Sequence, residues 1–141
     1  VITAPIVPIE KHLARIALAD LFLDTFPCGA HTTASDALFA NVPVLTIQGN
    51  SFHSRVSSSI MWHSNGAEMI CGNQSEYVEK AIAIYQNKNK LEMVKTNIGD
   101  FQAPSSPYNI ETTTLSLEKA YESILNLSKP EPISIEPWWN K

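Results

Sequence analysis

The residues best suited to chemistry in this sequence follow a short apolar run, Leu21–Leu23. Asp24 ends that run, the loop Thr25–Ala30 contains a proline and a glycine, and a His-Thr-Thr triplet at positions 31–33 precedes a segment typical of a helix. The first N–H groups of a helix have no partner within it, and the helix dipole adds partial positive charge there. With threonine hydroxyls beside them, these groups predict a site for an anion such as a phosphate.

The same residues also fit structural or metal-binding roles. Thr33 and Asp36 have the spacing of a capping box, in which the two side chains bond reciprocally to backbone N–H groups at the helix start. Cys28 and His31 have a spacing that suits zinc, but a structural zinc site needs four ligands and no second close pair occurs, so we expect no metal. Cys28 alone does not indicate a nucleophile, because a loop residue explains it equally well.

Strands alternating with helices are expected to position this segment. Strands are predicted at Val1–Ala4, Leu21–Leu23, Val44–Ile47 and Met69–Cys71, and helices at Glu10–Ala19, Thr33–Ala40, Arg55–His63, Glu76–Tyr85, Lys90–Asn97 and Thr112–Leu127. Short strands without polar alternation are typical of a parallel sheet covered by helices on both faces, which binds ligands at the carboxyl ends of its strands. We therefore predict an α/β, Rossmann-like domain over residues 1–128, followed by an extended, proline-containing tail over residues 129–141.

Composition and charge limit the possible partners. The 141 residues, with 44% hydrophobic and 17% charged content, suit one globular domain. A net charge of -4 argues against a nucleic-acid binder, and the apolar runs are too short to span a membrane. Two cysteines and the absence of a signal peptide favour a cytoplasmic location, and a chain that starts with Val1 rather than Met indicates a fragment of a longer protein.

Several short motifs, in one order, resemble the O-GlcNAc transferase and SPINDLY family of glycosyltransferases. The similarity lies in the donor-site stretch Pro8–Asp36 and in Pro43–Thr46, Gly49, Ser54–Val56 and Ser106–Asn109. It implies the nucleotide-sugar-binding C-terminal domain of a GT-B fold. It also implies a metal-independent, inverting transfer of a sugar, most simply from UDP-GlcNAc, to protein Ser or Thr hydroxyls.

The resemblance implies which residues would contact the donor nucleotide. These are His31, Thr32 and Thr33 at the diphosphate, Asp36 at a ribose hydroxyl, and Val7, His12 and Arg15 at the base. The backbone of Val7 would read the base edge, and the His12 ring would stack on uracil. The acceptor site, the base candidates and a phosphate-binding lysine would lie upstream of Val1, so the protein acceptor would be bound by the missing N-terminal half and this chain alone would be inactive.

Other interpretations remain open on the sequence alone. His12 and Arg15 also suit an ordinary helix surface. Ile9 stands where O-GlcNAc transferases carry a lysine near the ribose, which leaves GDP-fucose or UDP-glucose as alternative donors. A non-catalytic nucleotide-binding module is a further possibility. An unrelated phosphate-binding enzyme, such as a sugar-nucleotide epimerase, would require an acid/base pair that we do not find in the sequence.

Overall fold

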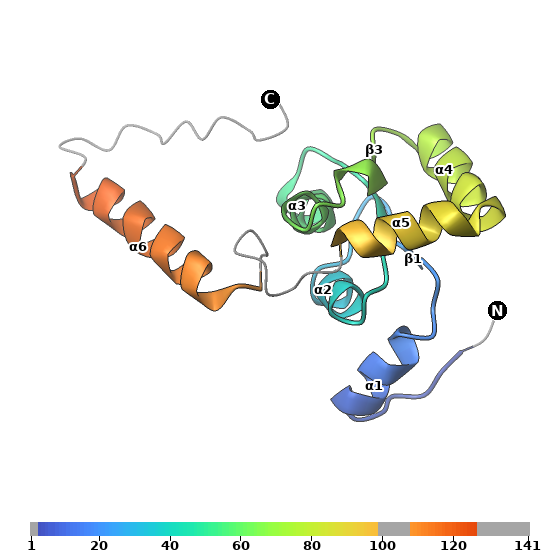
Figure 1. The fold of residues 1–141 in the computed structure, drawn as a ribbon. Helices are drawn as coiled ribbons and strands as arrows, with labels where there is room; N and C mark the ends of the chain where they lie inside the picture. Colours follow the sequence, from blue (N-terminus) through green and yellow to red (C-terminus); the bar gives the residue numbers. More distant parts are fainter. Residues whose placement is uncertain (1–2, 99–107, 127–141) are drawn as a thin grey trace. The chain divides into compact units, whose positions relative to one another are not determined.

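The computed structural model describes residues 3–98 and 108–126. Its contacts divide the chain into two compact units, residues 1–109 and residues 110–141. The first unit holds the strands and helices α1 to α5, and the second holds helix α6, Ile110–Asn126 (Figure 1). The domain boundary predicted at residue 128 and the tail predicted at 129–141 both lie outside the described residues.

The first unit is built on a small parallel sheet. Its strands are β1 (Phe22–Leu23), β2 (Val44–Ile47) and β3 (Ile70–Cys71), in the order β1-β2-β3. Phe22 pairs with Val44 and Thr46 pairs with Ile70, both in parallel register. The central strand β2 is the most buried, as expected for the middle strand of a parallel sheet covered by helices.

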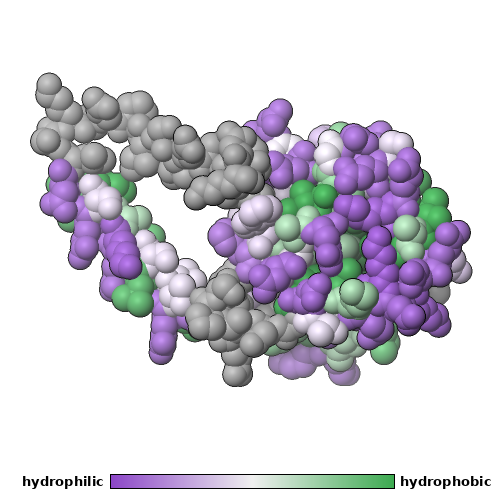
Figure 2. Space-filling model, turned by 45° about the horizontal axis from the view of Figure 1, so that its top comes forward, coloured by the Kyte–Doolittle hydropathy of each residue, from purple (hydrophilic) through white to green (hydrophobic). Residues whose placement is uncertain are grey.

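Helices cover the sheet and close the core. Helices α2 (Thr32–Phe39), α3 (Val56–His63) and α4 (Gln74–Gln86) contact β2, and α5 (Lys88–Ile98) packs against α4. The core side chains with the largest volumes are Leu38, Leu45, Met61 and Met69. Hydrophilic side chains cover most of the visible face of this unit, with hydrophobic ones in small groups between them (Figure 2). The predicted α/β parallel-sheet fold with helices on both faces is confirmed.

The N-terminal segment differs from the prediction. Thr3 and Ala4 form no strand, and Val1 and Ile2 lie outside the described residues. A strand requires a partner, and in the described part of the sheet β1 pairs with β2 alone. Helix α1 spans Ile9–Ile16 rather than Glu10–Ala19, because the N–H groups of Leu18 and Ala19 bond three residues back and tighten its last turn.

The remaining predicted helices are confirmed within about two residues at each end. Short 3-10 turns, η1 (Phe52–Ser54) and η2 (Ala67–Met69), precede α3 and β3 and were not predicted. Among the described residues, no helix is long and apolar enough to cross a membrane.

Candidate functional site

Asp24, at the end of β1, anchors the loop that leads to the His-Thr-Thr triplet. Its Oδ1 accepts hydrogen bonds from the backbone N–H of Thr25 at 2.8 Å and of Ala30 at 2.7 Å. Its Oδ2 accepts the Thr46 hydroxyl from the adjacent strand at 2.7 Å. The residue is only 7% exposed, so these bonds compensate a buried carboxylate. The sequence placed Asp24 at the strand end but did not predict this anchoring role.

The loop is also held from the side of η1. The Gly29 N–H donates to the His53 carbonyl at 3.0 Å, and the Ser57 hydroxyl of α3 donates to the Ala30 carbonyl. A Cβ atom at position 29 would lie 3.1 Å from Asp24 Oδ2 and 3.4 Å from the His53 carbonyl oxygen. The glycine therefore permits this close approach, and the loop delivers a fixed start to α2.

Helix α2 begins at Thr32, one residue earlier than predicted. Its N-cap is His31, with φ -114° and ψ -88°, and no side chain caps the helix. The predicted capping box of Thr33 and Asp36 is therefore wrong, because the earlier start places Thr33 inside the helix and Asp36 beyond its first turn. Within the described residues, neither the Thr32 nor the Thr33 hydroxyl forms a hydrogen bond, and both residues are exposed. They remain available to a ligand.

The His31 ring is oriented by the neighbouring turn. Its Nε2 lies 3.4 Å from the carbonyl oxygen of His53. Its plane stands edge-on to the Phe52 ring, at 84° with the centroids 5.8 Å apart. The side chain of His31, at the N-terminus of α2, is thus positioned by η1, for which no element was predicted.

A second part of the site lies on α1 and the segment before it. The predicted residues Val7, His12 and Arg15 line one hollow of about 370 Å³, together with Ile9 and neighbouring residues. The Arg15 side chain donates from Nη1 to the Pro5 carbonyl at 3.0 Å, and its Nη2 lies 3.2 Å from His12 Nδ1. Because a guanidinium can only donate, His12 Nδ1 is the acceptor in this contact.

His12 connects the two parts of the site. Its Nε2 lies 3.8 Å from a carboxylate oxygen of Asp36 on α2, and both side chains are partly accessible, at 31% and 23%. The contact joins α1 to α2 over a long stretch of sequence. The structure therefore brings the hollow lined by Val7, His12 and Arg15, predicted for the base, next to Asp36, predicted for the ribose. His31, Thr32 and Thr33, predicted for the diphosphate, lie at the start of the helix that carries Asp36.

Tyr108 supports α2 from the far end of the first unit. Its hydroxyl donates to the Ser35 carbonyl at 3.1 Å. Burial raises the pKa of this phenol, and the nearby carboxylate of Asp36 acts in the same direction. Local sequence patterns do not reveal this supporting role of Tyr108, because its partner Ser35 lies 73 positions away.

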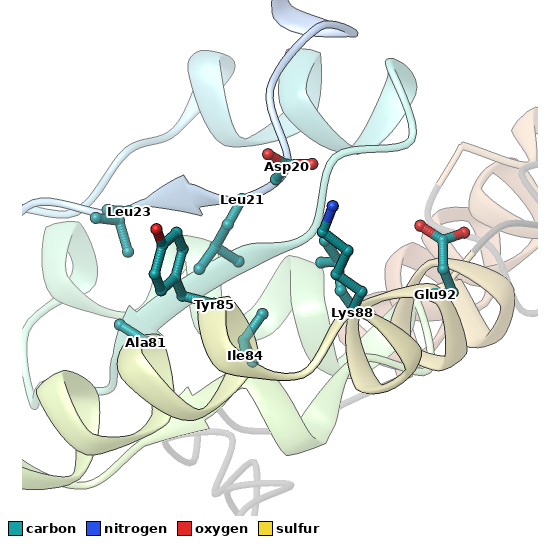
Figure 3. A pocket seen from close by; sticks show the side chains of 9 residues that line it. Asp20, Leu21, Leu23, Ala81, Ile84, Tyr85, Lys88 and Glu92 are labelled. Carbon is teal, nitrogen blue, oxygen red and sulfur yellow. The ribbon is translucent and has the colours of Figure 1, made fainter.

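A separate hollow of about 540 Å³ lies beside β1 and contains none of the predicted residues. It is lined by side chains from β1, from the two residues before it and from α4 and α5, including Leu21, Leu23, Ile84 and Tyr85 (Figure 3). Its wall is mostly apolar, with Asp20, Lys88 and Glu92 contributing charge. In the described part of the chain, no group of three or more His, Cys, Asp or Glu could hold a metal ion there or elsewhere.

Comparison with a solved structure defines the class of fold. The chain matches a mutant of the O-GlcNAc transferase from Thermobaculum terrenum with a TM-score of 0.78 and 26% identity, over 86% of this chain and 23% of that one. The described sheet and helices are therefore those of a GT-B glycosyltransferase domain, as the sequence predicted.

Sequence comparison then assigns the family. The model of Glycosyl transferase family 41 matches residues 1–117, and the chain belongs to that family. A probable UDP-N-acetylglucosamine–peptide N-acetylglucosaminyltransferase, SEC of Arabidopsis thaliana, is 32% identical over 119 residues, covering 84% of this chain and 12% of the relative. The corresponding Caenorhabditis elegans transferase is 28% identical over 121 residues, covering 81% and 10%. The chain thus spans only about a tenth of the length of these relatives.

Proposed function

We propose that this chain binds the nucleotide sugar used by a protein O-glycosyltransferase, with UDP-GlcNAc as the donor and Ser or Thr hydroxyls as the acceptors in the whole protein. The names of the relatives support the donor, since they describe transferases that use UDP-N-acetylglucosamine. The chemistry would need no metal, because helix N–H groups and side chains of this chain would meet the diphosphate charge.

The observation that carries the proposal is the contact between His12 and Asp36. It aligns a hollow of about 370 Å³, suited to a base, with the start of α2, suited to phosphates. The His12 ring lines this hollow and would offer a flat surface on which a base can stack. A nucleoside in the hollow would place its ribose near Asp36, whose carboxylate accepts hydrogen bonds from hydroxyls.

The diphosphate would lie at the start of α2. The backbone N–H groups of Thr32, Thr33 and Ala34 belong to the first turn, where a helix has no internal acceptors for them. The two threonine hydroxyls add donors, and the dipole of α2 favours negative charge at this end. The buried Asp24 carboxylate already holds the loop before α2 in the chain without ligand. Binding therefore has a smaller entropy cost, because this loop need not be ordered.

The identity of the donor's sugar and base depends on residues beside the hollow. Ile9, which is 55% exposed at the hollow, replaces the lysine of the O-GlcNAc transferase pattern with an apolar side chain. This replacement leaves a GDP-fucose or UDP-glucose donor open as the alternative. Competition of unlabelled GDP-fucose and UDP-glucose against UDP-GlcNAc separates these donors.

Calorimetric titration of the 141-residue chain with UDP, UMP and uridine tests the nucleotide site. UDP is expected to bind most tightly, because each charge-assisted hydrogen bond to the second phosphate contributes about 1.5 to 3 kcal/mol. In a chain without the acceptor half we expect affinity near 1 mM, about -4 kcal/mol. Equal affinities for UDP and UMP would remove the diphosphate role from His31, Thr32 and Thr33.

Sugar transfer is expected only from the whole protein. Holding donor and acceptor in reactive geometry supplies about 7 to 11 kcal/mol, and this chain provides residues for the donor alone. A radiolabelled donor incubated with a mixed peptide library should give no product with the 141-residue chain. Transfer by this chain that is abolished by Asp36→Ala would show that the acceptor site lies within these residues.

A further inference from the structure

We infer that Phe52, on the turn η1, forms the wall of the donor site against which the sugar packs. The inference rests on the proposed function, because it assumes that a nucleotide sugar places its diphosphate at His31 and the start of α2. Phe52 was not among the residues expected to bind the donor. Its side chain is 76% exposed, and its ring stands edge-on to the ring of His31.

The turn that carries Phe52 is held by a dense set of hydrogen bonds. The Gly49 N–H donates to the Ser54 carbonyl at 3.0 Å, and the Ser51 N–H donates to the Ser54 hydroxyl at 3.1 Å. The hydroxyls of Ser51 and Ser54 lie 2.8 Å apart, and Ser51 Oγ lies 3.1 Å from His53 Nε2. The phenyl ring is therefore presented from a fixed backbone although its surface is open to solvent.

The position of the ring matches the next part of the donor. In a nucleotide sugar the sugar is joined to the second phosphate, so it lies directly beside the group that binds the diphosphate. Phe52 lies beside His31, with ring centroids 5.8 Å apart. One face of a pyranose consists largely of C–H groups, which pack favourably on the negative face of an aromatic ring. Ligand sites commonly combine such apolar walls with a few polar groups.

Saturation-transfer NMR with UDP-GlcNAc tests the inference on the 141-residue chain. Saturation is measured separately at the sugar protons and at the uracil protons, which serve as the internal reference. The variants are Phe52→Ala, Phe52→Tyr, which keeps an aromatic ring, and Tyr85→Ala. Tyr85 is a matched control, because it is 87% exposed and lines the hollow beside β1 instead.

In the unmodified chain, sugar and uracil protons should both receive saturation. Phe52→Ala should lower the sugar signal at least twofold relative to uracil, whereas Phe52→Tyr and Tyr85→Ala should leave the ratio unchanged. An unchanged ratio of sugar to uracil saturation in Phe52→Ala would overturn the inference. An equal loss at the sugar and uracil protons would also overturn it, because it would mean that Phe52 only orients His31. Failure of the proposed function looks different: no proton of UDP-GlcNAc would then be saturated in the unmodified chain.

Discussion

Replacement of Asp24 tests whether its hydrogen bonds fix the loop that precedes α2. The Asp24 carboxylate accepts three hydrogen bonds, two from loop N–H groups and one from the Thr46 hydroxyl. Asp24→Ala removes all three and leaves the Thr46 hydroxyl, in a residue only 1% exposed, without this partner. Asp24→Asn keeps an oxygen for the loop N–H groups, and the Thr46 hydroxyl can rotate to accept from the new amide.

The expected losses follow from these contacts. Hydrogen bonds to a charged group contribute about 1.5 to 3 kcal/mol each, but removing the carboxylate also relieves the cost of burying it. We expect Asp24→Ala to lower the free energy of unfolding by about 3 to 5 kcal/mol, because three donors each lose an acceptor at a cost of about 1 to 3 kcal/mol and the relieved desolvation of the carboxylate offsets part of this. Asp24→Asn should cost about 1 to 2 kcal/mol, the loss of charge assistance alone.

Urea denaturation followed by circular dichroism measures both variants. Thr46→Val is the matched control, since it removes one of the three bonds while keeping the shape of the side chain. A stability for Asp24→Ala within about 1 kcal/mol of the unmodified chain would refute the anchoring role, because ordinary surface substitutions fall in that range. A double variant, Asp24→Asn with Thr46→Val, should show non-additive losses, as expected for residues in direct contact.

Three further predictions follow from other contacts. His12→Ala should weaken UDP binding by about 1 to 3 kcal/mol with circular dichroism unchanged, and unchanged affinity in calorimetry would make His12 a bystander. Tyr108→Phe removes the bond to the Ser35 carbonyl and should lower the free energy of unfolding by about 0.5 to 1.5 kcal/mol in urea, whereas no loss would contradict that contact. Burial raises the pKa of the Cys71 thiol, whereas Cys28 is exposed. An aromatic disulfide reagent at about pH 8 should therefore modify Cys28 at once and Cys71 only after unfolding or at higher pH. Equal rates of modification at the two thiols would contradict this.

The features that local sequence patterns specify were predicted best. The largely apolar, β-branched residues of β2 and the periodic apolar stripe of α6 are local signals, and both elements were found where these signals predict them. The anion site expected at positions 31–33 also rests on a local pattern, namely a loop, two hydroxyls and a helix start, and it stays a prediction. The start of α2 was predicted wrongly. Thr33 and Asp36 have the spacing of a capping box, but in the structure Asp36 faces His12 instead.

The features that depend on distant residues were not visible in the sequence. Asp24 meets Thr46, Tyr108 meets Ser35, and the His53 carbonyl holds both Gly29 and His31, in each case across a long stretch of chain. A carboxylate at the end of a buried strand, before a glycine loop, was the available signal for Asp24. The assignment of Val7, His12 and Arg15 to the base came from the family resemblance, and the structure adds that they share one hollow.

Amide chemical-shift mapping with UDP on the ¹⁵N-labelled 141-residue chain tests the central claim most directly, because it reports where the nucleotide binds. The account predicts saturable shifts at two separate stretches of sequence, His31–Ala34 at the start of α2 and Val7–His12 at the hollow of α1. Uridine should shift the second stretch and leave the first nearly unchanged. Shifts confined to residues around Leu21, Ile84 and Tyr85, beside β1, would contradict the claim and place the nucleotide in the other hollow.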